Sequence, residues 1–264
     1  MTVSDIIAAI EGFAPSHYQE SWDNTGLQVG DRSAECTGVL VCVDITPGVV
    51  DEAISRGCNL IVSHHPLLFN GLKSITGATP VEQSVIRAIG GGVSIYSSHT
   101  AVDNTPGGVS HTMAARLGVR PDAVLAPLAS QPGGEIGTGV VGNLPEALTP
   151  ELLIALVKET FGSPVARCTN PDAAARQITR VAMCGGSGGS LIADAEASGA
   201  QAYITSDTRY HDFVDHQNSI LIIDIGHFES EQCTKDIFYQ IIRQKFANFA
   251  VYKSTTETNP IHYV

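Results

Sequence analysis

The sequence predicts an α/β protein made of two related α/β halves with mainly parallel sheets. Short apolar runs alternate with helix-like segments along the 264 residues, and strands that alternate with helices form parallel sheets. Three of the apolar runs end in residues that can bind a metal. Sites in such sheets form beyond the carboxyl ends of the strands. We therefore expect a metal site between the halves, at strand carboxyl ends.

The first half is expected over residues 1–125. Thr2 or Ser4 caps an amino-terminal helix, and Pro47 occupies the first turn of the next one. A continuous apolar run such as GVLVCVD is typical of a strand buried on both faces. The expected elements are a helix within 1–13, a strand at 38–44, a helix at 47–56, a strand at 60–63, a helix at 80–89, a glycine turn at 90–92, a strand at 93–98 and a helix at 109–117.

The second half is expected over residues 126–264, with a boundary near 121–135. Residues 119–150 are rich in Pro, Gly and Ala and give the weakest structural signal. Whether the tail packs back on the first half stays open. The expected elements are a helix at 150–161, a strand at 177–184, a glycine break at 185–190, a helix at 191–198, strands at 202–206 and 219–224, one helix at 229–245 and a strand-like segment at 249–253.

Composition and charge narrow the class of protein. Hydrophobic residues make up 43% of the chain and charged ones 16%, which is ordinary for a globular domain. The net charge of −12 and the lack of basic runs argue against nucleic acid as a partner. The first residues lack a signal-peptide pattern, no apolar run is long enough for a membrane span, and the cysteines are scattered. We expect a reducing, cytoplasmic environment and no membrane contact.

The stretch LIVSHHPLLF carries the most specific chemical signal. Pro66 cannot donate a ladder hydrogen bond, so the strand should stop at His64 and His65. Adjacent strand residues point to opposite faces, but a turn at the strand end can offer both imidazoles to neighbouring ions. The alternative is a pair of surface histidines at a strand–loop junction.

Further candidate ligands follow two other apolar runs. Asp103 comes after the strand at 93–98, and His227 and Glu231 are four residues apart after the strand at 219–224. On a helix, residues four apart share a face and can converge on one ion. The five residues are a plausible dinuclear set that suits Zn, Fe, Mn or Co. Each residue taken alone has another interpretation. Asp103 could form a turn, Glu231 could be a solvated helix residue, and His227 could cap a helix.

Other residues suggest supporting roles. Amides in the glycine loop could hold a phosphate, although tight packing of a turn explains the glycines equally well. His99 and His211 are candidate proton shuttles, and Asp207 lies four residues before His211. In SWDNTGLQVG, either Trp22 anchors an Asx turn in the core or the polar residues face a cleft. In the glycine loop, the candidate phosphate-binding residues are Gly185, Gly186, Ser187 and Gly188.

The motifs SWDNTGLQVG, VSHHPLLF, SSHTAVDN, CGGSGGS, YITSDTRYHD and DIGHFESE resemble those of the Nif-three-like proteins, also labelled GTP cyclohydrolase 1 type 2 homologues. The resemblance spans Trp22 to Glu231. It implies two α/β halves without an inserted middle domain, and a ring-shaped homohexamer. It also implies two divalent ions per subunit, with Glu231 as the bridge. One departure is Thr205-Ser206-Asp207, where the family often has Gly-Glu or Gly-Asp. The implied ligands are His64, His65, Asp103, His227 and Glu231.

These observations favour a metal-dependent hydrolase of a nucleotide-like substrate, with GTP ring opening as one concrete version. A phosphoesterase using the same ions is a close alternative. A metal-binding regulatory or assembly protein without rapid turnover stays open, as does a small-molecule binding domain without metal.

Overall fold

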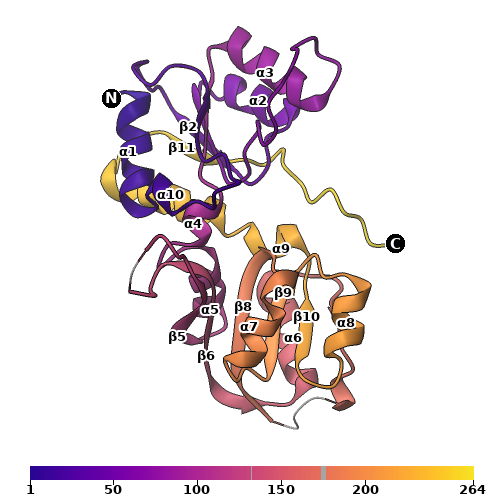
Figure 1. The fold of residues 1–264 in the computed structure, drawn as a ribbon. Helices are drawn as coiled ribbons and strands as arrows, with labels where there is room; N and C mark the ends of the chain where they lie inside the picture. Colours follow the sequence, from indigo (N-terminus) through magenta and orange to yellow (C-terminus); the bar gives the residue numbers. More distant parts are fainter. Residues whose placement is uncertain (132, 174–176) are drawn as a thin grey trace. The chain divides into compact units, whose positions relative to one another are not determined.

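The computed structural model describes residues 1–131, 133–173 and 177–264 (Figure 1). The chain forms two compact units. Unit 1 comprises Met1–Thr105 and Thr234–Pro260, and unit 2 comprises Pro106–Cys233 and Ile261–Val264. The expected halves met at residue 125. In the structure residues 106–125 belong to unit 2, and most of the tail belongs to unit 1.

Unit 1 is a mixed sheet of strand order β1-β4-β3-β2-β11 with helices on it. The pairs β4–β3, β3–β2 and β2–β11 are parallel, and β1 pairs with β4 antiparallel. Its elements are α1 (Val3–Phe13), η1 (Ser16–Tyr18), β1 (Gly26–Val29), β2 (Val39–Cys42), α2 (Pro47–Ser55), β3 (Leu60–Ser63), α3 (Pro80–Gly91), β4 (Ser94–Ser97), α4 (Thr100–Asp103), α10 (Thr234–Lys245) and β11 (Val251–Lys253).

The core of unit 1 explains why these segments are strands and helices. Leu40 and Ile61 are fully buried and pack in one cluster with Val49 of α2 and Val85 of α3. Their neighbours along the strands, such as Val41, are also fully buried. Successive side chains alternate between faces, so both faces of β2 and β3 are covered. Thr2 caps α1 through a capping box, as expected.

Unit 2 holds a mixed sheet of strand order β5-β6-β8-β9-β10-β7. The central pairs β8–β9 and β9–β10 are parallel, and α6, α7 and α8 lie beside these strands in Figure 1. Its elements are α5 (Val109–Arg116), β5 (Arg120–Pro127), β6 (Gly137–Leu148), α6 (Pro150–Phe161), β7 (Arg167–Cys168), η2 (Pro171–Ala173), β8 (Ile178–Ser187), η3 (Gly189–Leu191), α7 (Ile192–Ala197), β9 (Ala202–Ser206), α8 (Tyr210–His216), β10 (Leu221–Asp224) and α9 (His227–Glu231).

The two sheets confirm the predicted α/β class, with parallel strands at the centre of each sheet. Several local expectations were wrong. The region around residue 121, where no strand was expected, contains the antiparallel pair β5–β6. Gly90 and Gly91 extend α3 instead of forming a turn. The glycine run does not end β8, because Ser187 still pairs with Ser206 of β9.

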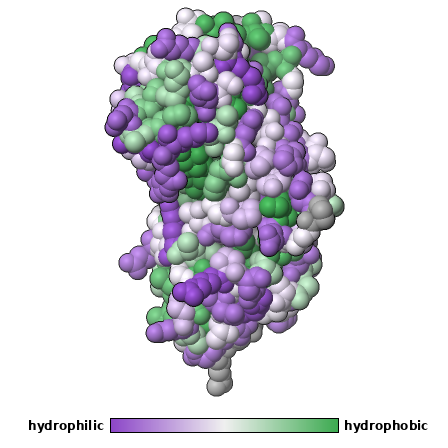
Figure 2. Space-filling view, turned by 90° about the vertical axis from the view of Figure 1, so that its left-hand side faces the viewer, coloured by the Kyte–Doolittle hydropathy of each residue, from purple (hydrophilic) through white to green (hydrophobic). Residues whose placement is uncertain are grey.

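The predicted helix at 229–245 is two helices, α9 and α10. The break between the two helices falls where the chain passes from unit 2 to unit 1, at Cys233 and Thr234. On the face shown in Figure 2, hydrophilic residues are widespread and hydrophobic ones form smaller groups among them. No helix of the described ranges has the length and apolar character needed to cross a bilayer.

Candidate metal centre

The histidines of unit 1 meet at one edge of its sheet. Strands β2, β3 and β4 are parallel neighbours, with Cys42 opposite Ser63 and Ser63 opposite Ser97. All three strands therefore end at the same edge. The histidine pair follows β3 directly, and Asp44 and His99 each follow their strand after one intervening residue. Sheet order thus brings together residues from three separate motifs.

The three imidazoles form a compact group. One ligand atom from each of His64, His65 and His99 lies within 4.8 Å of the other two. Ring centroids are 4.9 Å apart for His64–His65, 5.3 Å for His64–His99 and 5.4 Å for His65–His99. His64 is fully buried, and the other two are half-buried. Three converging imidazoles are a donor set that suits Zn²⁺ and similar ions.

Each of these imidazoles has an oxygen partner at Nδ1. Nδ1 of His65 lies 2.8 Å from Oδ1 of Asp44, and Nδ1 of His99 lies 2.9 Å from Oδ1 of Asp23. Nδ1 of His64 lies 3.2 Å from the carbonyl oxygen of Ser98. An acceptor at Nδ1 favours the tautomer with a proton there, which leaves the Nε2 lone pair for an ion. The donor chemistry of unit 1 therefore fits a divalent metal.

Asp103 reaches the same place through the single-turn helix α4. This helix begins directly after His99, so Asp103 is one helical turn beyond it. Oδ1 of Asp103 lies 3.8 Å from Nε2 of His64. The sequence indicated a turn at Asp103 and no helix here, but it named both His99 and Asp103 as candidate site residues.

Asp23 lies in the loop whose polar residues could have faced a cleft, but its side chain is buried and held by hydrogen bonds. Its side chain has no exposed surface, and it accepts hydrogen bonds from the backbone N–H (3.0 Å) and the hydroxyl (2.5 Å) of Thr100. Burial alone raises the pKa of Asp23. Hydrogen bonds from His99 and Thr100 outweigh burial and hold this pKa well below its ordinary value. Asp23 is therefore a charged acceptor that orients His99.

Unit 2 holds the second pair of predicted ligands on α9. Nε2 of His227 lies 2.9 Å from Oε2 of Glu231, one helical turn away. Glu231 is 2% exposed, so its carboxylate has a buried and defined position. Nδ1 of His227 lies 2.8 Å from Oδ2 of Asp207, a residue with φ of 54° at the end of β9. His227 thus repeats the arrangement that the unit 1 histidines show.

The glycine loop packs closely around this pair. The Gly186 N–H donates to Oγ of Ser230 (2.9 Å), and the Gly188 N–H points to the Ser206 carbonyl (3.4 Å). A Cβ atom on Gly186 would lie 2.0 Å from Oε1 of Glu231. These contacts give Gly186 a packing role, and phosphate binding by the loop stays a prediction.

A pocket of about 280 Å³ opens beside the same loop. Ser187, which is exposed, lines it together with Asp207 and Arg209. Asp207 therefore connects the pocket to His227. The lining also includes the carboxylates of Asp207 and Asp212, so Arg209 is the lining side chain suited to an anionic group of a ligand.

His211 lies apart from the imidazole group of unit 1 in the sequence and on an exposed face of α8. Its ring is 5.4 Å from that of Tyr210. Asp207, which we considered as its partner, bonds to His227 instead. A proton-shuttle role for His211 stays a prediction.

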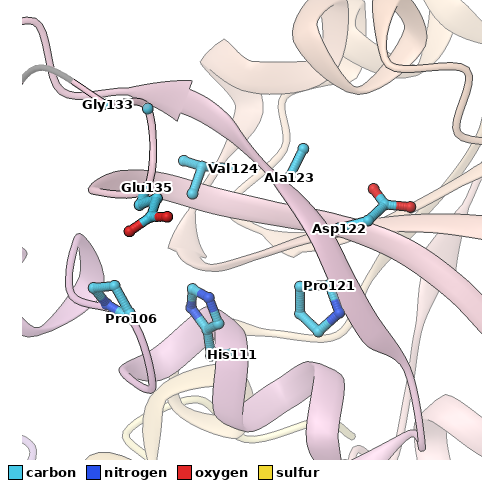
Figure 3. Close-up of a pocket in the computed structure, with 9 residues that line it drawn as sticks. Pro106, His111, Pro121, Asp122, Ala123, Val124, Gly133 and Glu135 are labelled. Carbon is cyan, nitrogen blue, oxygen red and sulfur yellow. The ribbon is translucent and has the colours of Figure 1, made fainter.

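A larger pocket of about 410 Å³ lies elsewhere in unit 2, between α5 and β5. Figure 3 shows His111 directed into it, with Pro106 and Pro121 on either side. Burial lowers the pKa of His111. The lining side chains that the structure describes include no predicted ligand, so this pocket is separate from the candidate centre.

Sequence reasoning missed Asp44 and left the role of Asp207 open. Asp44 is the last residue of the apolar run GVLVCVD, and Asp207 directly follows β9. Both positions carry the same signal that identified the ligands, a polar residue at the end of a buried strand.

The comparisons agree on one family. Residues 1–260 match the family model described as Duf34/NIF3 (NGG1p interacting factor 3). Relatives described as GTP cyclohydrolase 1 type 2 homologs occur in Clostridium perfringens (37% identical over 232 residues, 88% of this chain and 87% of the relative) and Lactococcus lactis (35% over 268 residues, 99% of each). The structure of Staphylococcus aureus protein SA1388 is 26% identical, covers 100% of this chain and 99% of its own, and superposes with a TM-score of 0.89. The chain therefore belongs to the DUF34/NIF3 family.

Proposed function

We propose that this protein is a metal-dependent hydrolase of a nucleotide-like substrate that uses two divalent ions per subunit. One observation carries the proposal: the proposed ligands His64, His65 and His227 each have an oxygen acceptor at Nδ1. This pattern is typical of imidazoles that present Nε2 to a metal. The names of the relatives support nucleotide chemistry.

We assign the ions to the five residues His64, His65, Asp103, His227 and Glu231. Two divalent ions, when bound, supply a hydroxide at neutral pH by lowering the pKa of water from about 16 to about 7, and they polarise the group under attack. Their identity would be Zn, Fe, Mn or Co, which all accept imidazole and carboxylate ligands. His227 and Glu231 alone offer too few donors for a closed site.

The remaining polar residues receive roles in binding and proton transfer. Asp44, Asp23 and Asp207 orient their histidines. His99, whose Nδ1 is held by Asp23, accepts a proton at Nε2, and His211 is the second candidate shuttle. Arg209 and Ser187 at the 280 Å³ pocket would bind the anionic part of the substrate. Ring opening of GTP and phosphoester hydrolysis are the two reactions to test.

The first test measures metal per chain by elemental analysis, for the unaltered protein, Glu231→Gln and the control Glu146→Gln. Glu146 is an exposed carboxylate of β6 in the same unit. We expect about two ions per chain, a sharp loss in Glu231→Gln and no loss in the control. A protein that takes up neither Zn, Mn nor Fe after purification without chelator would contradict the proposal.

The second test screens nucleotides and phosphoesters for hydrolysis with the metal-loaded protein. Tight metal binding with no turnover on any substrate would favour the alternative, a regulatory or assembly protein. A homohexamer, which the resemblance implies, is a further proposal, and sedimentation would give its mass.

A further inference from the structure

Two large aromatic side chains of unit 1 are exposed side by side. Trp22 is 60% exposed and Phe69 is 49% exposed. Their ring centroids are 6.1 Å apart with an interplanar angle of 57°. Aromatic side chains normally contribute their large apolar surface to a core or an interface. The alternative that placed Trp22 in the core is wrong, and the exposed pair needs another explanation.

The two loops that carry these rings are tied to each other by hydrogen bonds. Nδ2 of Asn24 donates to the Leu68 carbonyl oxygen at 2.6 Å, and the Leu68 N–H donates to Oε1 of Gln28 at 2.8 Å. Nε2 of Gln28 in turn donates to the Asn24 carbonyl oxygen at 2.8 Å. Polar contacts therefore hold the rings in place without burying them. Such preorganisation lowers the entropy cost of binding a ligand.

The pair lies next to the imidazole group of unit 1. The ring centroid of His99 is 6.0 Å from that of Trp22 and 6.3 Å from that of Phe69. Asp23, the residue after Trp22, holds Nδ1 of His99. Any flat molecule that contacts both aromatic rings would therefore have an edge close to His99.

We propose that Trp22 and Phe69 form an aromatic platform for the planar heterocycle of the substrate, a nucleobase or a similar ring, which stacks on the face of one ring and meets the other, tilted ring at an edge. This inference rests on the proposed function and names the substrate class of its site. A nucleobase carries no charge, so the protein's net charge of −12 does not repel it from the platform. In proteins that bind single-stranded nucleic acid, stacking of a base on an aromatic side chain changes affinity by roughly 5- to 150-fold per base.

A second copy of the chain is the competing occupant. A standard interface buries about 800 Å² per partner. Two aromatic side chains supply at most about 500 Å², since each buries roughly 150–250 Å². The platform is thus small for an interface and of the right size for one ring system. Its position beside His99 also favours a substrate.

Trp22 is the single tryptophan of the sequence, so its fluorescence reports directly on the platform. The experiment titrates the full-length, metal-loaded protein with guanosine, adenosine, uridine, ribose and inorganic tripolyphosphate. Free N-acetyltryptophanamide serves as the control for collisional quenching. We expect saturable quenching by at least one nucleoside and none by ribose or tripolyphosphate. Absence of saturable quenching by every nucleoside, or equal quenching by tripolyphosphate, overturns the proposal.

Variants separate stacking from general apolar contact. Phe69→Ala should weaken nucleoside binding by roughly 5- to 150-fold, and Phe69→Leu should recover only part of it because the leucine side chain lacks a π face. Ile89→Ala is the control, since Ile89 is 63% exposed on α3 in the same unit. Trp22→Phe, followed by calorimetry, should retain binding. If Phe69→Ala changes the sedimenting mass and leaves quenching unaltered, the platform is a subunit interface and the proposal fails.

The two proposals fail in different ways. Saturable quenching by a nucleoside without hydrolysis of any substrate supports the platform and contradicts the hydrolase. Metal-dependent hydrolysis with a KM that Phe69→Ala leaves unchanged supports the hydrolase and contradicts the platform.

Discussion

Gly186 and Glu231 are packed so closely that a Cβ atom on Gly186 would lie 2.0 Å from Oε1 of Glu231. Gly186 also has a φ of 66°, a conformation that side-chain-bearing residues rarely adopt. The glycine therefore leaves room for the Glu231 carboxylate, which would help to hold the proposed ions. This relationship gives the glycine loop a function that requires no phosphate.

Gly186→Ala should lower both stability and metal content. We expect a loss of about 1–3 kcal/mol in the free energy of unfolding from backbone strain, and fewer ions per chain because Glu231 must move. Gly162→Ala is the matched control, since Gly162 has a φ of 65° and open space around it. It should show the strain without the loss of metal. Equal metal content in both variants would contradict the role assigned to Gly186.

Asp44→Asn and Asp207→Asn should weaken metal binding although neither residue is a proposed ligand. Each carboxylate holds Nδ1 of a histidine at 2.8 Å. Removing such a partner typically costs 10- to 100-fold in metal affinity. Competition with a chromophoric chelator measures the change. Asp51→Asn, at an exposed ion pair with Arg87, should leave the affinity unchanged.

His99→Gln and His211→Ala should test the two proton-shuttle assignments. A general base contributes roughly 10²- to 10⁴-fold to turnover, so a shuttle variant should lose activity in that range while retaining its metal. His17→Ala, at an exposed residue of η1, is the control. Loss of an ion in His99→Gln would instead identify His99 as a ligand. Unchanged turnover in His211→Ala would exclude His211.

The protein should be less stable in acid because of Glu52. This residue of α2 accepts hydrogen bonds from residues 254–256. Burial alone would raise the pKa of Glu52, but hydrogen bonds from Ser254 and the following backbone prevail and lower it to about 2. A lowered folded-state pKa gives stability that is fully present above the unfolded value near 4.5. That stability is lost as the pH falls toward 2.

Glu52→Gln should therefore unfold more easily at pH 7, by about 1–3 kcal/mol. The free energy of unfolding of Glu52→Gln should also vary less between pH 5 and pH 3 than that of the unaltered protein. Urea unfolding at several pH values measures both effects. Glu146→Gln, at an exposed carboxyl, should match the unaltered protein within about 0.5 kcal/mol. Parallel pH profiles for all three proteins would contradict the role of Glu52.

The sequence by itself determined the α/β class and most helices and strands. Buried strands such as Leu60–Ser63 are short apolar runs, and Pro47 and Pro80 mark helix starts, so local chemistry suffices there. It failed at β5 and β6. Pro121 and Pro127 lie on an edge strand, and Pro145 lies where the β6 register shifts. A sheet accommodates proline at such positions, but proline argues against a strand when only the sequence is read.

The tertiary structure decided which polar residues are partners. Asp23 and His99 are 76 residues apart in sequence, and only the docking of the Trp22 turn against α4 joins them. The exposure of Trp22 likewise depends on contacts with a loop beyond β3. Local sequence fixes which residues follow a strand end. The order of the strands in the sheet fixes which of those residues meet, because that order depends on long-range packing that no single segment encodes.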